Sequence, residues 1–205
     1  MIKEITNQIA YIPATDSPLS ADIGLITGEK SIYIFDTGDG DASFRELTKY
    51  LKDFPDKETC LIVSHFHKDH TGNFGRHDFS RAYVGSFTAK YVAPSEIVTS
   101  PVVIEDGVKL MIFPLPSSHA KGSLGLMVND EFVFLGDGTY SNEAKGEAVY
   151  NRGLLQQELK VLKALPAGKF LLSHKPRFIY PAKVVIRELE SVYDRRVQGE
   201  AFIKA

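Results

Sequence analysis

The chain of 205 residues has a single cysteine, no tryptophan and no apolar run near the roughly 18 residues of a membrane span. One cysteine, Cys60, cannot form an intramolecular disulfide, and we expect it to pack as a small apolar side chain in a reducing, cytoplasmic setting. The N-terminal segment lacks the basic, apolar and small-residue succession of a secretory signal. We therefore expect neither a signal peptide nor a membrane anchor.

An excess of either charge is also lacking, since 24 Lys and Arg face 26 Asp and Glu. The net charge of -2 offers no basic surface to a phosphate backbone, which disfavours nucleic acid as a partner. Hydrophobic residues make up 43% of the chain and charged residues 24%, a balance typical of a globular protein. At this length we expect one domain over residues 1–205, while the oligomeric state stays open.

Short apolar runs rich in Ile, Val, Phe and Tyr predict strands, and apolar residues at three- and four-residue spacing predict helices. The expected helices cover residues 42–54, 153–165 and 181–193, with a shorter one over 87–92. The expected strands cover residues 5–12, 23–27, 31–36, 60–64, 82–85, 101–104, 109–114, 123–128, 132–135 and 169–173. This order predicts an α/β or α+β domain in which two sheets pack together with helices outside.

Two kinds of connection matter for this architecture. Turn residues at 27–30 and 128–131 indicate hairpins, so the sheets must contain antiparallel pairs. The polar stretch 14–22 predicts a loop long enough to reach over a neighbouring site.

Three of the six histidines lie with an aspartate in one short window directly after an apolar strand: His65, His67, Asp69 and His70. In an extended segment, His65 and His67 point to the same side and can hold one ion. Once the chain bends, Asp69 and His70 are close enough to serve a second ion beside it. Imidazole and carboxylate ligands suit a divalent cation such as zinc.

Other candidate ligands also follow apolar strands: His119, Asp137 and His174 each come after one, as does Asp36. Because strand ends on one edge of a layered domain converge, we expect these side chains to meet the histidine window in space. His77 has no strand before it and is not expected to bind metal.

The window at residues 65–70 resembles the HxHxDH signature of the metallo-β-lactamase superfamily. Residues 35–38 (Phe-Asp-Thr-Gly), 118–123 (Ser-His-Ala-Lys-Gly-Ser) and 136–137 (Gly-Asp) resemble further segments of that superfamily, and His174 takes the last ligand position. The resemblance implies a four-layer αβ/βα sandwich with a dinuclear metal centre along one edge.

Carried over residue by residue, the resemblance implies one metal bound by His65, His67 and His119. A second metal would be bound by Asp69, His70 and His174, and Asp137 would bridge the two. Asp137 makes the chain more similar to the glyoxalase II, lactonase and phosphodiesterase branches than to zinc β-lactamases, which commonly have cysteine in the second site. Asp36 is expected to support a ligand histidine rather than bind metal.

Four side chains are predicted to act on the substrate. Asp69 is expected to steer or shuttle a proton with its free oxygen. Tyr140, three residues beyond Asp137, is placed like the tyrosine of the lactonase branch and is predicted to hydrogen-bond the substrate carbonyl. Lys121 and Lys175 each lie beside a proposed ligand, so a cationic rim that selects an anionic substrate is expected.

These residues predict a metal-dependent hydrolase that uses a metal-bound hydroxide to cleave a small ester, thioester, lactone or phosphodiester. The cofactors would be two divalent ions, with Zn²⁺ favoured over Mn²⁺ or Fe²⁺. Two alternatives stay open: an iron-dependent redox enzyme of the same fold, and a metal-binding protein without activity.

Overall fold

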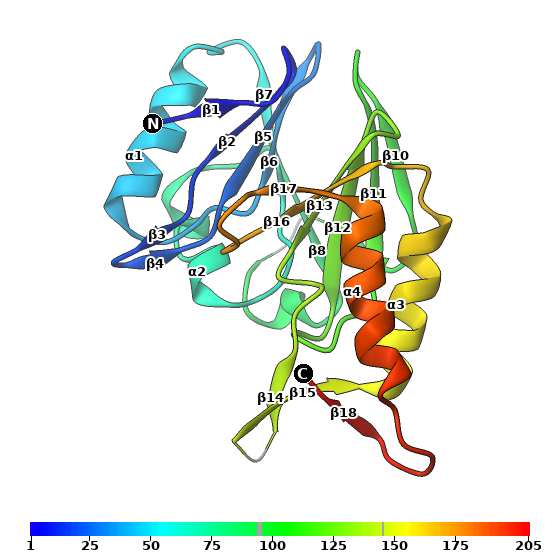
Figure 1. The fold of residues 1–205 in the computed structure, drawn as a ribbon. Coiled ribbons are helices and arrows are strands. Elements are labelled where there is room, and N and C mark those ends of the chain that lie inside the picture. The colour runs from blue at the N-terminus through cyan, green and yellow to red at the C-terminus, as the bar shows by residue number, and fades with distance from the viewer. Residues whose placement is uncertain (94–95, 145) are drawn as a thin grey trace.

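The computed structural model describes residues 1–93, 96–144 and 146–205, in which two large β-sheets pack face to face (Figure 1). In chain order the seven strands of the first sheet are β1 (Lys3–Glu4), β2 (Ile9–Ile12), β5 (Ile23–Thr27), β6 (Ser31–Phe35), β7 (Glu58–Ile62), β8 (Arg81–Gly85) and β9 (Glu96–Val98), which is also their spatial order. The six strands of the second sheet are β10 (Val102–Glu105), β11 (Lys109–Leu115), β12 (Ser123–Val128), β13 (Phe132–Gly136), β16 (Lys169–Leu172) and β17 (Ile179–Pro181).

Apolar side chains from both sheets fill the space between them, Phe35 and Ile62 on one side and Leu126 and Phe134 on the other. Helix α1 (Gly40–Lys52) buries Leu47 against the outer face of the first sheet. Helices α3 (Arg152–Ala164) and α4 (Ala182–Asp194) cover the outer face of the second sheet (Figure 1). The layers are therefore helix, sheet, sheet, helix, which confirms the expected mixed α/β sandwich.

All three long helices predicted from apolar spacing are present, within a few residues of the expected ends. Each of the first two begins at a side-chain cap, because Asp39 accepts a hydrogen bond from the N–H of Gly40 and Asn151 accepts one from Leu154. No helix in the described part of the chain is long and apolar enough to cross a membrane.

The structure corrects the sequence prediction at several places. The helix expected over residues 87–92 is only a single 3₁₀ turn, η2 (Thr88–Lys90). The strand expected from residue 5 begins at Ile9, because the Thr6 hydroxyl accepts hydrogen bonds from the N–H groups of Gln8 and Ile9 and holds a turn there. Further elements not expected from the sequence are the short helix α2 (Lys68–Thr71), the 3₁₀ turn η1 (Phe74–Arg76) and the strands β1, β9 and β17 of the large sheets, with β3 (Thr15–Asp16), β4 (Leu19–Ser20), β14 (Asn142–Ala144), β15 (Glu147–Asn151) and β18 (Phe202–Lys204).

Parallel pairing brings the carboxyl ends of neighbouring strands to one edge of the sandwich. Strands β6, β7, β8 and β9 run parallel in the first sheet, and β13 pairs parallel with β16 in the second. At this edge the chain turns sharply, with positive φ angles of 65° at Asp36, 54° at Gly136 and 60° at His174. Glycine adopts a positive φ without strain, whereas Asp36 and His174 carry a Cβ and are strained there. Such strain persists only where the surroundings hold it, and it commonly marks functional sites.

Glu158 on α3 is an unexpected charge in the core. It is fully buried, and neither carboxylate oxygen has a hydrogen-bond partner among the described residues. Burial raises the pKa of Glu158 well above its ordinary value. Below the unfolded-state pKa of about 4.3, both states hold the proton; as the pH rises past it, only the unfolded chain releases that proton. The free energy of unfolding therefore falls with rising pH until the folded-state pKa is reached.

Glu158→Gln removes this titration, so we expect a flatter pH dependence and an unfolding free energy about 1–3 kcal/mol higher near pH 8. Urea unfolding at several pH values measures both effects. Glu188→Gln, at an exposed position on α4, is the matched control and should leave the pH profile unchanged. Identical profiles for wild type and Glu158→Gln would contradict the burial argument.

Candidate metal centre

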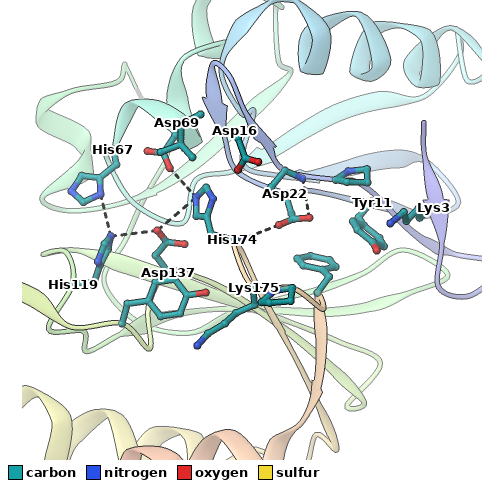
Figure 2. A pocket seen from close by; sticks show the side chains of 16 residues that line it. Lys3, Tyr11, Asp16, Asp22, His67, Asp69, His119, Asp137, His174 and Lys175 are labelled. Carbon is teal, nitrogen blue, oxygen red and sulfur yellow. Dashed lines mark hydrogen bonds and ion pairs between the residues drawn. The ribbon is translucent and has the colours of Figure 1, made fainter. Parts of the chain in front are cut away.

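Seven imidazole and carboxylate side chains gather at the edge where the strands end. Figure 2 shows the five of them that face the pocket: His67, Asp69, His119, Asp137 and His174. The seven come from the residues after β7, β11, β13 and β16 and from the short helix α2. Their donor atoms form two groups, each with all atoms within 4.8 Å of one another: His65, His67 and His119, and Asp69, His70, Asp137 and His174. The structure thus brings together every residue that the sequence singled out as a candidate ligand.

Short contacts join the side chains inside and between the two groups. His67 Nδ1 lies 3.1 Å from His119 Nε2, and His174 Nε2 lies 2.9 Å from Asp69 Oδ2. Asp137 Oδ2 lies 3.5 Å from His119 Nε2 and 3.4 Å from His70 Nε2, one histidine from each group. Asp137 therefore occupies the position of a shared carboxylate between the groups.

Three buried polar atoms at this centre have no hydrogen-bond partner among the described residues: His65 Nε2, His70 Nε2 and Asp137 Oδ1. A buried polar atom without a partner is costly, so such atoms are rare unless another group satisfies them. Imidazole nitrogens and carboxylate oxygens together form the donor set of zinc and related divalent ions. The residues present thus fit a pair of divalent cations.

Hydrogen bonds behind the histidines fix which ring nitrogen faces the centre. His70 Nδ1 donates to Asp36 Oδ2 over 2.7 Å, and the Ser64 hydroxyl donates to the same oxygen over 2.7 Å. Ser64 Oγ is thereby left to accept from His65 Nδ1 at 2.9 Å. His119 Nδ1 donates to the Ser141 carbonyl at 3.2 Å. In each of these rings Nε2 is therefore the nitrogen turned toward the centre, and it is the atom through which the ring would bind a cation.

Burial and neighbouring charges act differently on the two groups. Burial lowers the pKa of His65 well below its ordinary value, and the nearby His70 and His67 lower it further. Burial also lowers the pKa of His70, but the carboxylates of Asp36 and Asp137 outweigh it and raise this pKa to about 10. Burial also lowers the pKa of His67, so His65 and His67 are neutral imidazoles at pH 7, whereas the carboxylates around His70 attract positive charge.

Two further carboxylates shape the centre without joining either group. Asp36 is fully buried at the end of β6, and its Oδ1 accepts from the Ser64 N–H at 2.7 Å. Asp22 lies at the end of the stretch expected to be a loop, where its two oxygens accept from the N–H groups of Ala14 at 3.1 Å and His174 at 3.3 Å. The stretch contains the short hairpin β3–β4, and Asp22 ties it to the strand end that carries His174.

A pocket of about 800 Å³ opens in front of the centre (Figure 2). His67, Asp69, His119, Asp137 and His174 line one end of it. The remaining lining residues are Lys3, Tyr11, Pro13, Ala14, Asp16, Leu19, Asp22, Tyr140, Lys175, Pro176 and Phe178. The β3–β4 hairpin supplies part of this lining, so the segment does reach over the site as expected from the sequence.

Of the three residues predicted to contact the substrate, Lys175 and Tyr140 line the pocket, whereas Lys121 does not. Lys175 lines the pocket, with its Nζ 5.3 Å from the centre of the Tyr140 ring. Lys121 lies instead with its Nζ 5.9 Å from the Phe87 ring, and it is not among the described residues that line the pocket. The Tyr140 hydroxyl donates to the Ser173 carbonyl oxygen, next to His174. A phenol has one hydrogen to donate, so this contact and a substrate carbonyl compete for it.

Two residues of the centre were missed at the level of sequence, Ser64 and Asp22. A detectable signal existed for Ser64, because it is a polar residue between an apolar strand and His65. Asp22 carried no such signal, since its contact with His174 joins positions 152 residues apart.

The chain matches no protein-family model and no curated protein sequence. Solved structures, however, are similar over almost all of it. A metallo-β-lactamase from Pontibacter korlensis has a TM-score of 0.70 at 13% identity, with 96% of this chain and 99% of that chain covered.

Two larger proteins contain a region with a similar fold. A flavo di-iron protein from Thermotoga maritima has a TM-score of 0.72 at 12% identity, covering 97% of this chain and 63% of that chain. A sec-alkylsulfatase from Pseudomonas sp. has a TM-score of 0.74 at 14% identity, covering 94% of this chain and 41% of that one. These likenesses, together with the helix, sheet, sheet, helix layers, show that the chain has the metallo-β-lactamase fold.

Proposed function

We propose that the protein is a dinuclear metal-dependent hydrolase of a small ester, thioester, lactone or phosphodiester. The observation that carries the proposal is the gathering of seven donor side chains in two adjoining groups, with three of their buried atoms lacking any described hydrogen-bond partner. Such atoms destabilise a fold unless a ligand satisfies them. The centre retains these unfavourable buried atoms and lies at one end of an open pocket. Chemistry on a bound molecule explains both features best.

His65, His67 and His119 would hold one cation, and Asp69, His70 and His174 the other, with Asp137 between them. Zn²⁺ is favoured by the mixture of imidazole and carboxylate donors, with Mn²⁺ and Fe²⁺ as alternatives. When bound, two such ions acidify water and polarise a carbonyl or phosphoryl oxygen. The chain's own contribution is to fix the imidazoles in position through Asp36, Ser64 and the Ser141 carbonyl.

Asp69 is proposed as the residue that moves a proton. Its Oδ2 faces the Nε2 atoms of His174 at 2.9 Å and His70 at 3.4 Å, so Oδ1 is the oxygen left for proton transfer. Burial raises the pKa of Asp69, but hydrogen bonding from His174 and the charge of His70 outweigh it and lower the pKa below its ordinary value. The carboxylate is therefore ionised at neutral pH and ready to accept a proton.

Tyr140→Phe distinguishes two roles for the phenol. If the hydroxyl only holds Ser173 and so positions His174, we expect kcat and metal affinity to fall together, by about threefold to tenfold. If it hydrogen-bonds the substrate carbonyl, kcat/KM falls while metal content stays constant. Steady-state kinetics and metal analysis of the same preparation separate the two. The contact with Ser173 favours the positioning role.

Lys175→Met tests the cationic rim. Because Lys175 lines the pocket, we expect its loss to raise KM for anionic substrates by about threefold while leaving neutral ones unchanged. Lys121→Met is the matched control, since Lys121 lies against Phe87 and should not alter either KM. An equal change for anionic and neutral substrates would dismiss the rim.

The proposed function is tested by metal analysis followed by a substrate panel. We expect about two zinc or manganese ions per chain, and turnover of at least one class among chromogenic esters, thioesters, lactones and bis-phosphodiesters. Removal of metal with a chelator should abolish turnover, and added metal should restore it. Two bound iron atoms with redox activity would favour the iron-dependent alternative. Full metal loading without turnover of any class would favour a binding protein.

A further inference from the structure

The pocket extends well beyond the seven proposed ligands. In Figure 2, His67, Asp69, His119 and Asp137 lie at one end, His174 and Asp22 lie toward the middle, and Tyr11 and Lys3 lie at the other end. The pocket volume of about 800 Å³ is within the range of sites for drug-sized molecules and exceeds what two ions and a water require. Its far end therefore has room for a part of the substrate that does not react.

Aromatic rings form the floor of this far end. Tyr11 stacks on Phe178 with the ring centres 4.4 Å apart and the planes at 28°, and Phe178 in turn packs 6.0 Å from Phe134. Gly24, directly opposite Tyr11 on β5, makes room for these rings, because a Cβ there would lie 2.5 Å from the Phe134 ring. A supported pair of rings presents a fixed apolar platform.

A positive charge lies over one ring of the platform, that of Tyr11. Lys3 pairs directly with Tyr11 across β1 and β2, so the two side chains project from the same face of the sheet. Lys3 Nζ lies 5.8 Å from the centre of the Tyr11 ring, and it makes no ion pair with any carboxylate of the described residues. Its charge is thus available to a bound molecule.

The middle of the pocket carries the opposite charge. Asp22 lines it, and both carboxylate oxygens already accept backbone N–H groups. An anion placed there would be repelled and would find neither oxygen able to donate. An anionic group on the part of the substrate at the far end is therefore placed at Lys3, separated from the reacting bond by a neutral segment, whereas Lys175, beside Tyr140 and His174, would meet an anion closer to that bond.

We propose that the far end is a subsite for a flat aromatic group with an anionic substituent, stacked on Tyr11 and paired with Lys3. The substrate is then elongated: its scissile bond lies at the seven-residue centre, and its charged aromatic group lies at the opposite end of the pocket. The position of the scissile bond rests on the proposed hydrolase function, whereas the binding of the aromatic anion does not.

The test measures binding, without turnover, by isothermal titration calorimetry on the zinc-loaded chain. The probes are 3-phenylpropanoate, its neutral isostere 3-phenylpropanamide, and acetate, which reports carboxylate binding by the metals alone. Lys3→Met should weaken binding of 3-phenylpropanoate by about threefold to fivefold and leave the amide and acetate unchanged. Tyr11→Leu should weaken both aromatic probes by about fivefold to tenfold. Lys90→Met, at an exposed lysine next to Phe87, should change none of them.

Two results would overturn the subsite. If Lys3→Met leaves all three probes unchanged while Tyr11→Leu weakens the aromatic ones, the carboxylate binds at the metal end and the anionic part of the proposal is wrong. If neither substitution changes any probe, the far end is not a binding site. Absence of hydrolysis on every substrate class, with these binding effects present, would count against the proposed function alone.

Discussion

Replacement of His67 by Ala is expected to reduce bound metal from about two ions per chain to one and to lower kcat/KM by more than about 100-fold. His67 Nδ1 lies 3.1 Å from His119 Nε2 in the three-histidine group, so its loss leaves that group with two donors. The other group keeps its four donors and should retain its ion. Loss of a partner behind a ligand already costs 10–100-fold in such centres, and loss of a ligand costs more.

The chain provides a close control in His77→Ala. His77 Nε2 lies 3.2 Å from the Thr59 hydroxyl, and His77 belongs to neither donor group. Its loss should leave both metal content and turnover unchanged. Because the His67 side chain is only partly buried, both variants should fold, and circular dichroism can verify this. Metal content of about two ions in the His67 variant would contradict its proposed role.

The strand ends were the part of the site most accessible from sequence. His65, His119, Asp137 and His174 each follow an apolar run whose strand is present. Parallel pairing aligns the strands before Asp137 and His174, and β11, which precedes His119, has the same direction as β13 because two antiparallel pairings separate them. Their proximity follows from local pattern plus a general property of layered sheets, so no detailed knowledge of packing was needed. The three long helices were predictable for the same reason, since their apolar spacing is a local signal.

Contacts between distant segments were not predictable in this way. Tyr11 stacks on Phe178, and Asp22 accepts a hydrogen bond from the N–H of His174, 152 residues away, and no local pattern encodes such contacts. The third sheet was missed for a similar reason, since β18 at the carboxyl end pairs with β15 more than 40 residues earlier. Whether such a short segment forms a strand depends on its pairing with a distant segment rather than on its own β propensity.

Asp36 has the largest expected effect on stability of any residue around the centre. It is fully buried, and it accepts three hydrogen bonds of 2.7 Å, from the Ser64 N–H, the Ser64 hydroxyl and His70 Nδ1. Its φ of 65° is tolerated by Asn as well as Asp, so Asp36→Asn preserves shape and backbone while it removes the charge.

We expect Asp36→Asn to lower the free energy of unfolding by about 3–5 kcal/mol, because a buried amide group then faces donors that it cannot satisfy and His70 loses its charged partner. Metal affinity should fall by about 10–100-fold, since the His70 ring is no longer held with Nε2 toward the centre. Urea unfolding of the metal-free chain and competition with a chelator measure the two effects separately.

Asp41→Asn supplies the comparison on the same side of the molecule. Asp41 is exposed on α1, where it pairs with Arg76 at 2.8 Å, and loss of such a surface pair should change the unfolding free energy by less than about 0.5 kcal/mol. Metal affinity should stay at the wild-type value. If Asp36→Asn behaved like Asp41→Asn in both measurements, Asp36 would not orient His70, and the explanation for the free Nε2 atoms at the centre would be wrong. If Asp36→Asn lowered stability but left metal affinity unchanged, Asp36 would stabilise the fold without orienting His70. Packing would then hold the His70 ring in its orientation.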